Sequence, residues 1–285
     1  MKRIFLFLSF LALLSSCNSS SSNPKVASAA KSDSASPSSA TATTVDTKNL
    51  KAADAATIMA RQQVPILCYH HIRDLSPGQA NSGYTVDTQR FKEQMKILAD
   101  SGYHSILPDQ LYNYLVYGTA LPSKPFMITY DDTDLEQFTV GKTEMDKHGF
   151  KGVYFLMTIS IGKPRYMNKE QIRQLADEGH AVEGHTWDHH RVDRYTGNDW
   201  QVQLDKPKKV IEDITGKKVD YFAFPFGVWS PSILPEIKNR GYKLAFQLGT
   251  KRDPQEPLMT VRRIIVDPAF TGPGLLRGMR NSFKG

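Results

Sequence analysis

The chain has 285 residues, of which 40% are hydrophobic, and a formal net charge of +7. This basic excess is modest, and no cluster of Lys and Arg with interleaved aromatic residues occurs in the sequence, which argues against a nucleic-acid partner. The two cysteines are Cys17 and Cys68. Because Cys17 lies in the N-terminal signal, Cys68 has no partner for an intrachain disulfide. Its apolar surroundings in the sequence favour an inert core residue.

The N-terminus has the layout of a bacterial export signal, with Lys2 and Arg3 followed by an apolar run and by small residues before Cys17. The run is too short for a stable membrane span. Leu14-Ser15-Ser16-Cys17 resembles the lipobox of bacterial lipoproteins, which implies a signal peptide over residues 1–17 and a lipid on Cys17. The alternative is a plain secretory peptide with an incidental cysteine.

Composition divides the rest of the chain into two parts. Residues 18–60 are rich in Ser, Ala and Thr and poor in large apolar side chains, so they cannot offset the entropy lost on ordering. We expect a flexible tether there, with a short helix over 54–61 at its end. Residues 61–285 are enough for one domain with a full core. We expect this domain to be a monomer.

Apolar runs of strand length alternate with amphipathic segments through the domain. The sequence predicts strands over 64–70, 103–107, 125–130, 152–158, 180–185, 221–226, 242–248 and 261–266. It predicts helices over 87–102, 108–118, 134–149, 168–179, 200–215 and 231–240. This alternation indicates a parallel sheet. Because no Gly-rich nucleotide loop follows the first strand, we expect a distorted (β/α) barrel of about seven to eight parallel strands rather than an open doubly wound sheet.

Polar residues interrupt the apolar pattern where four of the predicted strands end. They are Tyr69-His70-His71, Asp131-Asp132, His185 and Pro225-Phe226-Gly227. Active sites of parallel barrels lie at the carboxyl ends of the strands. The sequence therefore predicts a site at this rim.

Two histidines and two aspartates at this rim have the composition of a catalytic metal site. His185 and His189 are four residues apart, and at helical spacing they would share a face and could bind one ion. His190 is the alternative ligand if a loop presents them. One of the adjacent aspartates, Asp131 or Asp132, would complete a three-ligand set that leaves a position for water, and the other could act as a base on that water.

Simpler explanations exist for the same residues. The segment 185–190 could be a solvated His-rich turn. The aspartates could be the N-cap and first-turn acid of the following helix. Capping accounts well for Asp134, but it does not account for two acids directly at a strand end.

Three ordered motifs resemble those of the NodB-homology polysaccharide deacetylases, also called carbohydrate esterase family four. T-Y-D-D-T (129–133) is similar to the first motif, T-F-D-D-G. H-T-W-D-H (185–189) matches the second, H-[ST]-x-x-H, and F-A-F-P-F-G (222–227) resembles the third, R-x-P-Y-G. The likeness covers about residues 64–266. The segment P-I-L-C-Y-H-H-I (65–72) resembles the corresponding segment in one branch of the family, which contains deacetylases of biofilm poly-N-acetylglucosamine.

The resemblance implies a role for each matching residue. Asp131 would be the general base, and the metal would be bound by Asp132, His185 and His189. The metal would be Zn²⁺, with Co²⁺ or Ni²⁺ able to substitute. The backbone N–H of Phe226 would stabilise the oxyanion. The reaction would be the hydrolysis of N-acetyl groups on an amino-sugar polymer such as poly-N-acetylglucosamine, chitin or peptidoglycan.

The sequence departs from the family pattern at three positions. Thr133 replaces the glycine of the first motif, so the turn is expected to avoid a conformation that only glycine adopts. Ala223 replaces the arginine that in the family braces the catalytic aspartate. Arg262 or Arg263 could take over that role, or these arginines could instead be surface cations paired with acids. No histidine follows His190, so the general acid is assigned to His70. His71 is the competing candidate, and the two point to opposite faces of a strand.

The sequence leaves the substrate and the cell compartment open. Trp187 and Tyr69 are candidates for stacking on sugar rings. The leading hypothesis is a lipid-anchored deacetylase of the bacterial cell envelope, facing the periplasm or the cell surface, with a glycan substrate. The alternatives are an O-acetyl esterase acting on xylan or the cell wall, and a catalytically lapsed glycan-binding lipoprotein.

Overall fold

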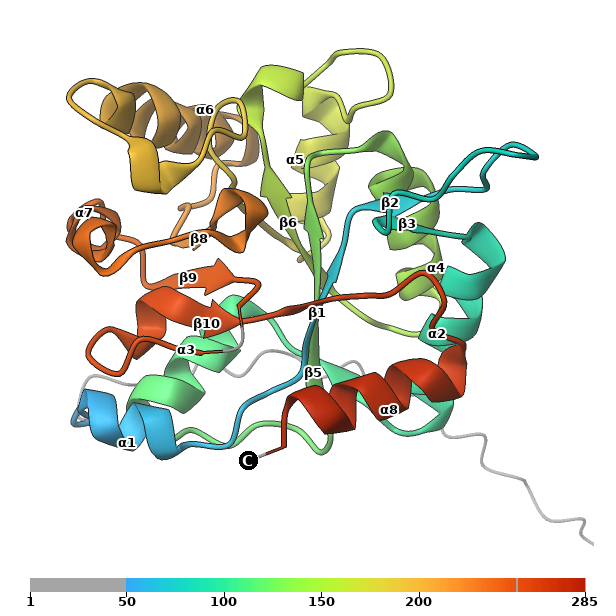
Figure 1. Cartoon of the computed structure of the whole chain (residues 1–285), viewed down its shortest axis with the longest axis horizontal. Helices are drawn as coiled ribbons and strands as arrows, with labels where there is room; N and C mark the ends of the chain where they lie inside the picture. Colours follow the sequence, from blue (N-terminus) through green and yellow to red (C-terminus); the bar gives the residue numbers. More distant parts are fainter. Residues whose placement is uncertain (1–49, 250, 285) are drawn as a thin grey trace, which may run out of the picture. The chain divides into compact units, whose positions relative to one another are not determined.

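The computed structural model describes residues 50–249 and 251–284, and its main feature is a nearly closed parallel barrel. Eight strands follow the order β10–β9–β8–β7–β6–β5–β1–β11, and β4 pairs with β5 in addition. With β4 the sheet has nine strands. These are β1 (Ile66–Tyr69), β4 (His104–Ser105), β5 (Pro125–Asp131), β6 (Gly152–Leu156), β7 (Ala181–Gly184), β8 (Tyr221–Ala223), β9 (Leu244–Gln247), β10 (Val261–Arg262) and β11 (Ile264–Ile265). Helices surround these strands in Figure 1, and the predicted fold class is confirmed.

The barrel closes through a segment that the sequence presents as one strand. The predicted strand 261–266 divides at Arg263, because β10 pairs with β9 whereas β11 pairs with β1. The backbone N–H of Arg263 donates to the carbonyl of Gln247 at 3.1 Å, and that of Val266 donates to Cys68 at 3.0 Å. One short segment therefore joins both ends of the sheet, with Arg263 at the junction.

Most predicted helices are present with close boundaries. They are α1 (Ala55–Ala60), α2 (Thr88–Asp100), α3 (Pro108–Tyr117), α4 (Thr143–Asp146), α5 (Lys169–Asp177), α6 (Lys206–Thr215) and α7 (Leu234–Asn239). Asn168 caps α5 by accepting from the N–H of Gln171, whose side chain returns the interaction in a capping box. The predicted helices 134–149 and 200–215 each contain a π-helical turn, at Gln137–Lys142 and Gln201–Asp205.

Three elements were not predicted. Helix α8 (Gly272–Ser282) packs beside α2, as Figure 1 shows. Its first turn contains glycine and proline, which disfavour a helix interior and mask the start of the helix in the sequence. The short strands β2 (His71–Ile72) and β3 (Thr85–Val86) form a separate two-stranded sheet.

Side-chain alternation along the strands decides which residues reach the barrel interior. Along β5, Met127 belongs to one buried cluster and Ile128 and Tyr130 to the other, so alternate residues face opposite sides. Asp131 has the same parity as Met127. The strand therefore directs the Asp131 carboxylate to the interior side at the carboxyl end of the barrel.

Candidate functional site

Asp131 is held by a buried arginine at the end of β5. The Arg263 guanidinium donates from Nη1 to Oδ1 of Asp131 at 2.7 Å and from Nη2 to Oδ2 at 2.8 Å. Both side chains are almost fully buried. A bidentate pair fixes the orientation of a carboxylate as well as its charge. Arg263 therefore occupies the bracing role that the absent motif arginine at Ala223 leaves open, whereas Arg262 bonds to Gln63 and to the carbonyl of Ser282.

This pairing keeps Asp131 ionised. Burial by itself raises the pKa of the Asp131 carboxyl, but the charges of Arg263 and then His185 outweigh burial and hold the pKa well below its usual range. The carboxylate is thus in the form that a proton acceptor requires across neutral and mildly acidic pH.

Asp132, His185 and His189 form what we call the metal cluster. Oδ1 of Asp132 lies 3.6 Å from Nε2 of His185 and 3.5 Å from Nε2 of His189. One ligand atom from each residue lies within 4.8 Å of the others. Two imidazoles and a carboxylate at this spacing suit a divalent cation such as Zn²⁺.

Hydrogen bonding selects the ring nitrogen that His185 presents to the cluster. Nδ1 of His185 donates to the carbonyl of Ala223 at 2.7 Å, which leaves Nε2 as the acceptor facing Asp132. Burial lowers the pKa of His185 to about 3, so the imidazole is neutral, as a metal ligand must be. Ala223 thus contributes its backbone to the site although it lacks the motif side chain.

Two ligand atoms of the metal cluster lack hydrogen-bond partners, as expected of a site that binds a cation. Oδ1 of Asp132 and Nε2 of His185 are buried and have no hydrogen-bond partner among the described residues. Burial, followed by the charges of Asp131 and Asp134, raises the pKa of Asp132 to about 6, with His70 opposing the shift. A divalent cation would satisfy both atoms and compensate the buried negative charge.

A loop rather than a helix presents the two histidines. Residues 185–190 follow β7 without helical structure, and both Thr186 (φ 69°) and His189 (φ 68°) are in the left-handed region. The hydroxyl of Thr186 accepts from the N–H of His189 at 2.9 Å. The helical-spacing argument for His189 was therefore wrong, although His189 does lie in the cluster. His190 is exposed, and its Nδ1 bonds to Asp188 at 2.5 Å, away from the cluster.

Thr133 adopts the glycine-like conformation that its side chain was expected to exclude. Its φ is 72°, and the preceding Asp132 has φ 80°. The Thr133 hydroxyl accepts from the N–H of Met157 at 2.9 Å, and the Thr133 carbonyl accepts from the N–H of Met167 at 3.0 Å. These bonds hold a buried β-branched residue in a region that costs about 1–2 kcal/mol for a residue with a Cβ.

Substitutions at Thr133 should separate this strain from the hydrogen bonds. We expect Thr133→Ala to lose about 1–3 kcal/mol of unfolding free energy, because it leaves the part-buried Met157 N–H unpaired and keeps the strained φ. Thr133→Gly loses the same bond but relieves the strain, so it should unfold at a higher urea concentration than Thr133→Ala. An equal or lower midpoint for the glycine variant would contradict the strain.

The two histidines after β1 point to different surroundings. His70, Cys68 and Asp131 each offer one ligand-type atom within 4.8 Å of the others, so His70 lies beside the proposed base. His71 instead lies with its Nδ1 3.0 Å from Oδ2 of Asp134. The prediction that Asp134 merely caps a helix is therefore wrong, since its carboxylate faces His71. The adjacent carboxylates of Asp134 and then Glu136 raise the pKa of His71 to about 9.

Tyr69 is not available to a sugar ring. It is 1% exposed, its hydroxyl donates to Oε1 of Gln94 at 2.8 Å, and its ring packs edge-on against Phe91. The prediction of sugar stacking failed because Tyr69 shares the parity of Leu67, on the helix-facing side of β1. Trp187, in contrast, is 40% exposed.

Phe226 borders an open pocket next to the metal cluster. The centroid of its ring lies 4.3 Å from that of His189, and the residue is 59% exposed. The backbone of Phe226 has a positive φ of 61°. The next residue must be glycine, because a Cβ at Gly227 would lie 2.5 Å from the Leu248 nitrogen. The pocket has a volume of about 560 Å³ and is lined by Asp188, His189, His190, Arg191, Arg194, Tyr195, Asp199, Gln203 and Phe226.

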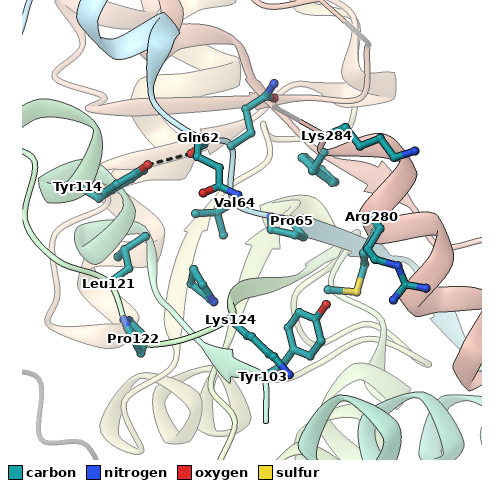
Figure 2. A pocket seen from close by; sticks show the side chains of 14 residues that line it. Gln62, Val64, Pro65, Tyr103, Tyr114, Leu121, Pro122, Lys124, Arg280 and Lys284 are labelled. Atoms are coloured by element: carbon teal, nitrogen blue, oxygen red, sulfur yellow. Dashed lines mark hydrogen bonds between the residues drawn. The ribbon is translucent and has the colours of Figure 1, made fainter. Parts of the chain in front are cut away.

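A different pocket lies at the opposite ends of the strands. Figure 2 shows it around Val64 and Pro65, with the Tyr114 hydroxyl donating to the carbonyl of Gln62 at 3.1 Å. It also has a volume of about 560 Å³, and no member of the metal cluster lines it. Since Pro125 lines this pocket whereas Asp131 ends the same strand, the pocket is remote from the candidate chemistry.

Comparison with known proteins agrees with this geometry. Residues 118–245 match the polysaccharide deacetylase family. This segment carries a polysaccharide deacetylase domain. The chain is 25% identical over 215 residues to the putative polysaccharide deacetylase YxkH of Bacillus subtilis, covering 74% of each chain. It is 23% identical over 230 residues to the poly-β-1,6-N-acetyl-D-glucosamine N-deacetylase of Staphylococcus aureus, covering 72% of this chain and 79% of that one.

Solved structures share the fold of the chain. The Streptococcus pyogenes deacetylase PplD, in complex with acetate, superposes with a TM-score of 0.71 at 22% identity, covering 76% of this chain and 98% of that one. IcaB from Ammonifex degensii superposes with a TM-score of 0.65 at 22% identity, covering 77% and 98%. The family match and the Bacillus and Staphylococcus relatives, rather than these superpositions, confirm the enzyme class predicted from the motifs, a carbohydrate deacetylase.

The N-terminus of the chain matches a membrane-attachment signal. Residues 1–18 match the prokaryotic membrane lipoprotein lipid attachment site, in agreement with a lipid-anchored protein of the cell envelope. Cys17 and the segment 1–49 lie outside the described residues. Among the residues that are described, we find no helix with the length and apolar character needed to cross a bilayer.

Proposed function

We propose that the chain is a metal-dependent N-deacetylase of an N-acetylglucosamine polymer, anchored at the cell envelope through Cys17 and linked to its anchor by residues 18–60. The observation that carries this proposal is the position of the metal cluster beside an ionised, Arg263-braced Asp131. The name of the Staphylococcus aureus relative supports a β-1,6-linked polymer as the substrate.

The proposed division of labour follows from charge and position. Asp132, His185 and His189 hold the cation, which when bound supplies a Lewis acid that activates water and polarises the acetyl carbonyl. Asp131 accepts the proton of the attacking water, and its pairing with Arg263 fixes the accepting oxygens. His70, beside Asp131, donates a proton to the departing amine.

Two further residues complete the proposed site. The backbone N–H of Phe226 donates to the oxyanion of the tetrahedral intermediate, next to His189. Trp187, which is 40% exposed, offers an aromatic face to a sugar ring of the polymer. The pocket beyond Phe226 gives neighbouring sugars of the polymer room to bind.

The paired variants His189→Gln and His190→Gln test the ligand set. We expect His189→Gln to lower Zn²⁺ affinity more than about 100-fold, beyond the effect typical of an outer-shell change, and to abolish acetate release. His190→Gln should keep both, because its side chain is exposed and bonded to Asp188. Metal content after dialysis and acetate release, measured on the full chain in detergent, distinguish the two. The opposite pattern would assign the ligand to His190.

A substrate panel tests the bond and the polymer. We expect the zinc-loaded full chain to release acetate from β-1,6-linked N-acetylglucosamine oligomers, and a chelator such as dipicolinate to stop the release. Peptidoglycan, chitin oligomers and acetylated xylan serve as comparison substrates. Release from acetylated xylan alone would replace the N-deacetylase with an O-acetyl esterase, and no release from any substrate would favour a glycan-binding role.

A further inference from the structure

A second group of ligand-type atoms lies close in sequence to the proposed base. Nδ1 of His71 is 3.0 Å from Oδ2 of Asp134 and 3.4 Å from Oε1 of Glu136. The three atoms all lie within 4.8 Å of one another. We call these three residues the His71 cluster. It joins β2, the turn that follows Asp132, and the start of the next helix.

The three atoms are buried, close together and unsatisfied. None of them has a hydrogen-bond partner among the described residues, and Asp134 is only 4% exposed. At 3.0 Å an imidazole N–H directed at the carboxylate would form a hydrogen bond, so the atoms approach each other without the alignment that a hydrogen bond requires. Acceptor atoms that surround a common cation are arranged in this way.

The metal cluster shows the same arrangement. Asp132 and His185 also place buried, unpartnered atoms 3.6 Å apart. A third His-carboxylate group, Asp146–Glu178–His180, differs because the ammonium of Lys142 lies 2.7 Å from Asp146 and 2.5 Å from Glu178. That group already contains a buried ammonium, whereas the His71 cluster has no lysine within ion-pair distance among the described residues and meets only the half-exposed guanidinium of Arg73, 3.5 Å from Glu136.

We propose that His71, Asp134 and Glu136 bind a second divalent cation, separate from the one in the metal cluster. One imidazole nitrogen and two carboxylate oxygens suit Zn²⁺ or Mn²⁺. The two carboxylates balance the charge of the ion. When the ion binds, it displaces the proton that His71 otherwise carries. Arg73 Nη1 lies 3.5 Å from Oε1 of Glu136, so it weakens the site, but its side chain is 37% exposed and can turn toward solvent.

The second cation would act on the active site by position. His71 follows the proposed acid His70, and Asp134 lies two residues after the metal ligand Asp132. A cation that joins His71 to Asp134 therefore fixes the spacing between the segments that carry acid, base and first metal ligand. The residues of the His71 cluster are proposed to contact neither the substrate nor the first metal ion.

Metal counting on the full chain in detergent tests the proposal. After dialysis against Zn²⁺ at pH 8 and removal of free metal, we expect two ions per chain for wild type by mass spectrometry of the metal. Glu136→Gln and His71→Gln should each retain one, as should His185→Gln. The double variant Glu136→Gln/His185→Gln should retain none. One ion in wild type, or two in Glu136→Gln, would overturn the second site.

Two variants control for folding and for charge. Glu178→Gln removes a carboxylate from the lysine-filled group, so it should keep two ions and rule out a general effect of losing a glutamate. Arg73→Gln removes the opposing charge, and we expect it to tighten binding of the second ion at least about threefold in a Zn²⁺ titration. Unchanged or weaker binding would favour a protonated His71 over a cation. Circular dichroism confirms the fold of each variant.

Discussion

The variant Asp131→Asn should keep the first metal ion and lose about 10²–10⁴-fold in kcat for acetate release. Asparagine has the size of aspartate but cannot accept a proton from water. The metal cluster consists of Asp132, His185 and His189, so its ligands are unchanged. Metal content and steady-state kinetics on the same sample check both halves of this prediction.

The same variant should also be less stable. It leaves the buried guanidinium of Arg263 opposite a neutral amide, and breaking a buried ion pair from one side costs about 3–5 kcal/mol. Kinetics therefore have to be measured well below the lowered unfolding temperature. Asp213→Asn, which alters an exposed carboxylate bonded to Lys209, is the matched control and should change neither property. Wild-type turnover in folded Asp131→Asn would remove Asp131 from the role of base.

The barrel could be predicted from sequence because its strands are local patterns. Apolar runs such as 125–130 and 152–158 are bounded by turn residues, and their alternation with amphipathic helices is sufficient to indicate a parallel sheet. The same reasoning failed at 261–266. That segment divides because its first part pairs with β9 and its second part with β1. A local sequence pattern cannot predict pairing with strands that are distant in the chain.

The site residues show the same division between local and tertiary information. Motif spacing located Asp132, His185 and His189, which do lie together. It did not provide the conformation that unites them, because the positive φ of Thr186 and His189 is imposed by the loop rather than by residue type. The partner of Asp134 was missed for a similar reason: His71 approaches it from β2, far away in the sequence.

Arg263 was only one of several alternatives in the sequence, and its position in the structure makes it the second strong test. We expect Arg263→Gln to lower the unfolding free energy by about 3–5 kcal/mol, because Asp131 then remains as an unpaired buried charge. Arg262→Gln is the matched control, since the neighbouring Arg262 hydrogen-bonds to Gln63 and to the carbonyl of Ser282 and lies over the Phe283 ring, away from Asp131. It should lose much less, on the scale of about 1 kcal/mol per hydrogen bond.

The pH profile distinguishes positioning of Asp131 from a purely structural effect of Arg263. Burial raises the pKa of the Asp131 carboxyl and Arg263 is the largest opposing influence, so removing Arg263 leaves burial dominant and the pKa rises. The base would then be protonated as pH falls through its new, higher pKa. In Arg263→Gln the acidic limb of kcat/KM should therefore move to higher pH, while in Arg262→Gln it should stay in place. A limb that stays at the wild-type pH in Arg263→Gln, with activity lost equally at all pH values, would mean that Arg263 stabilises the barrel seam without tuning the base.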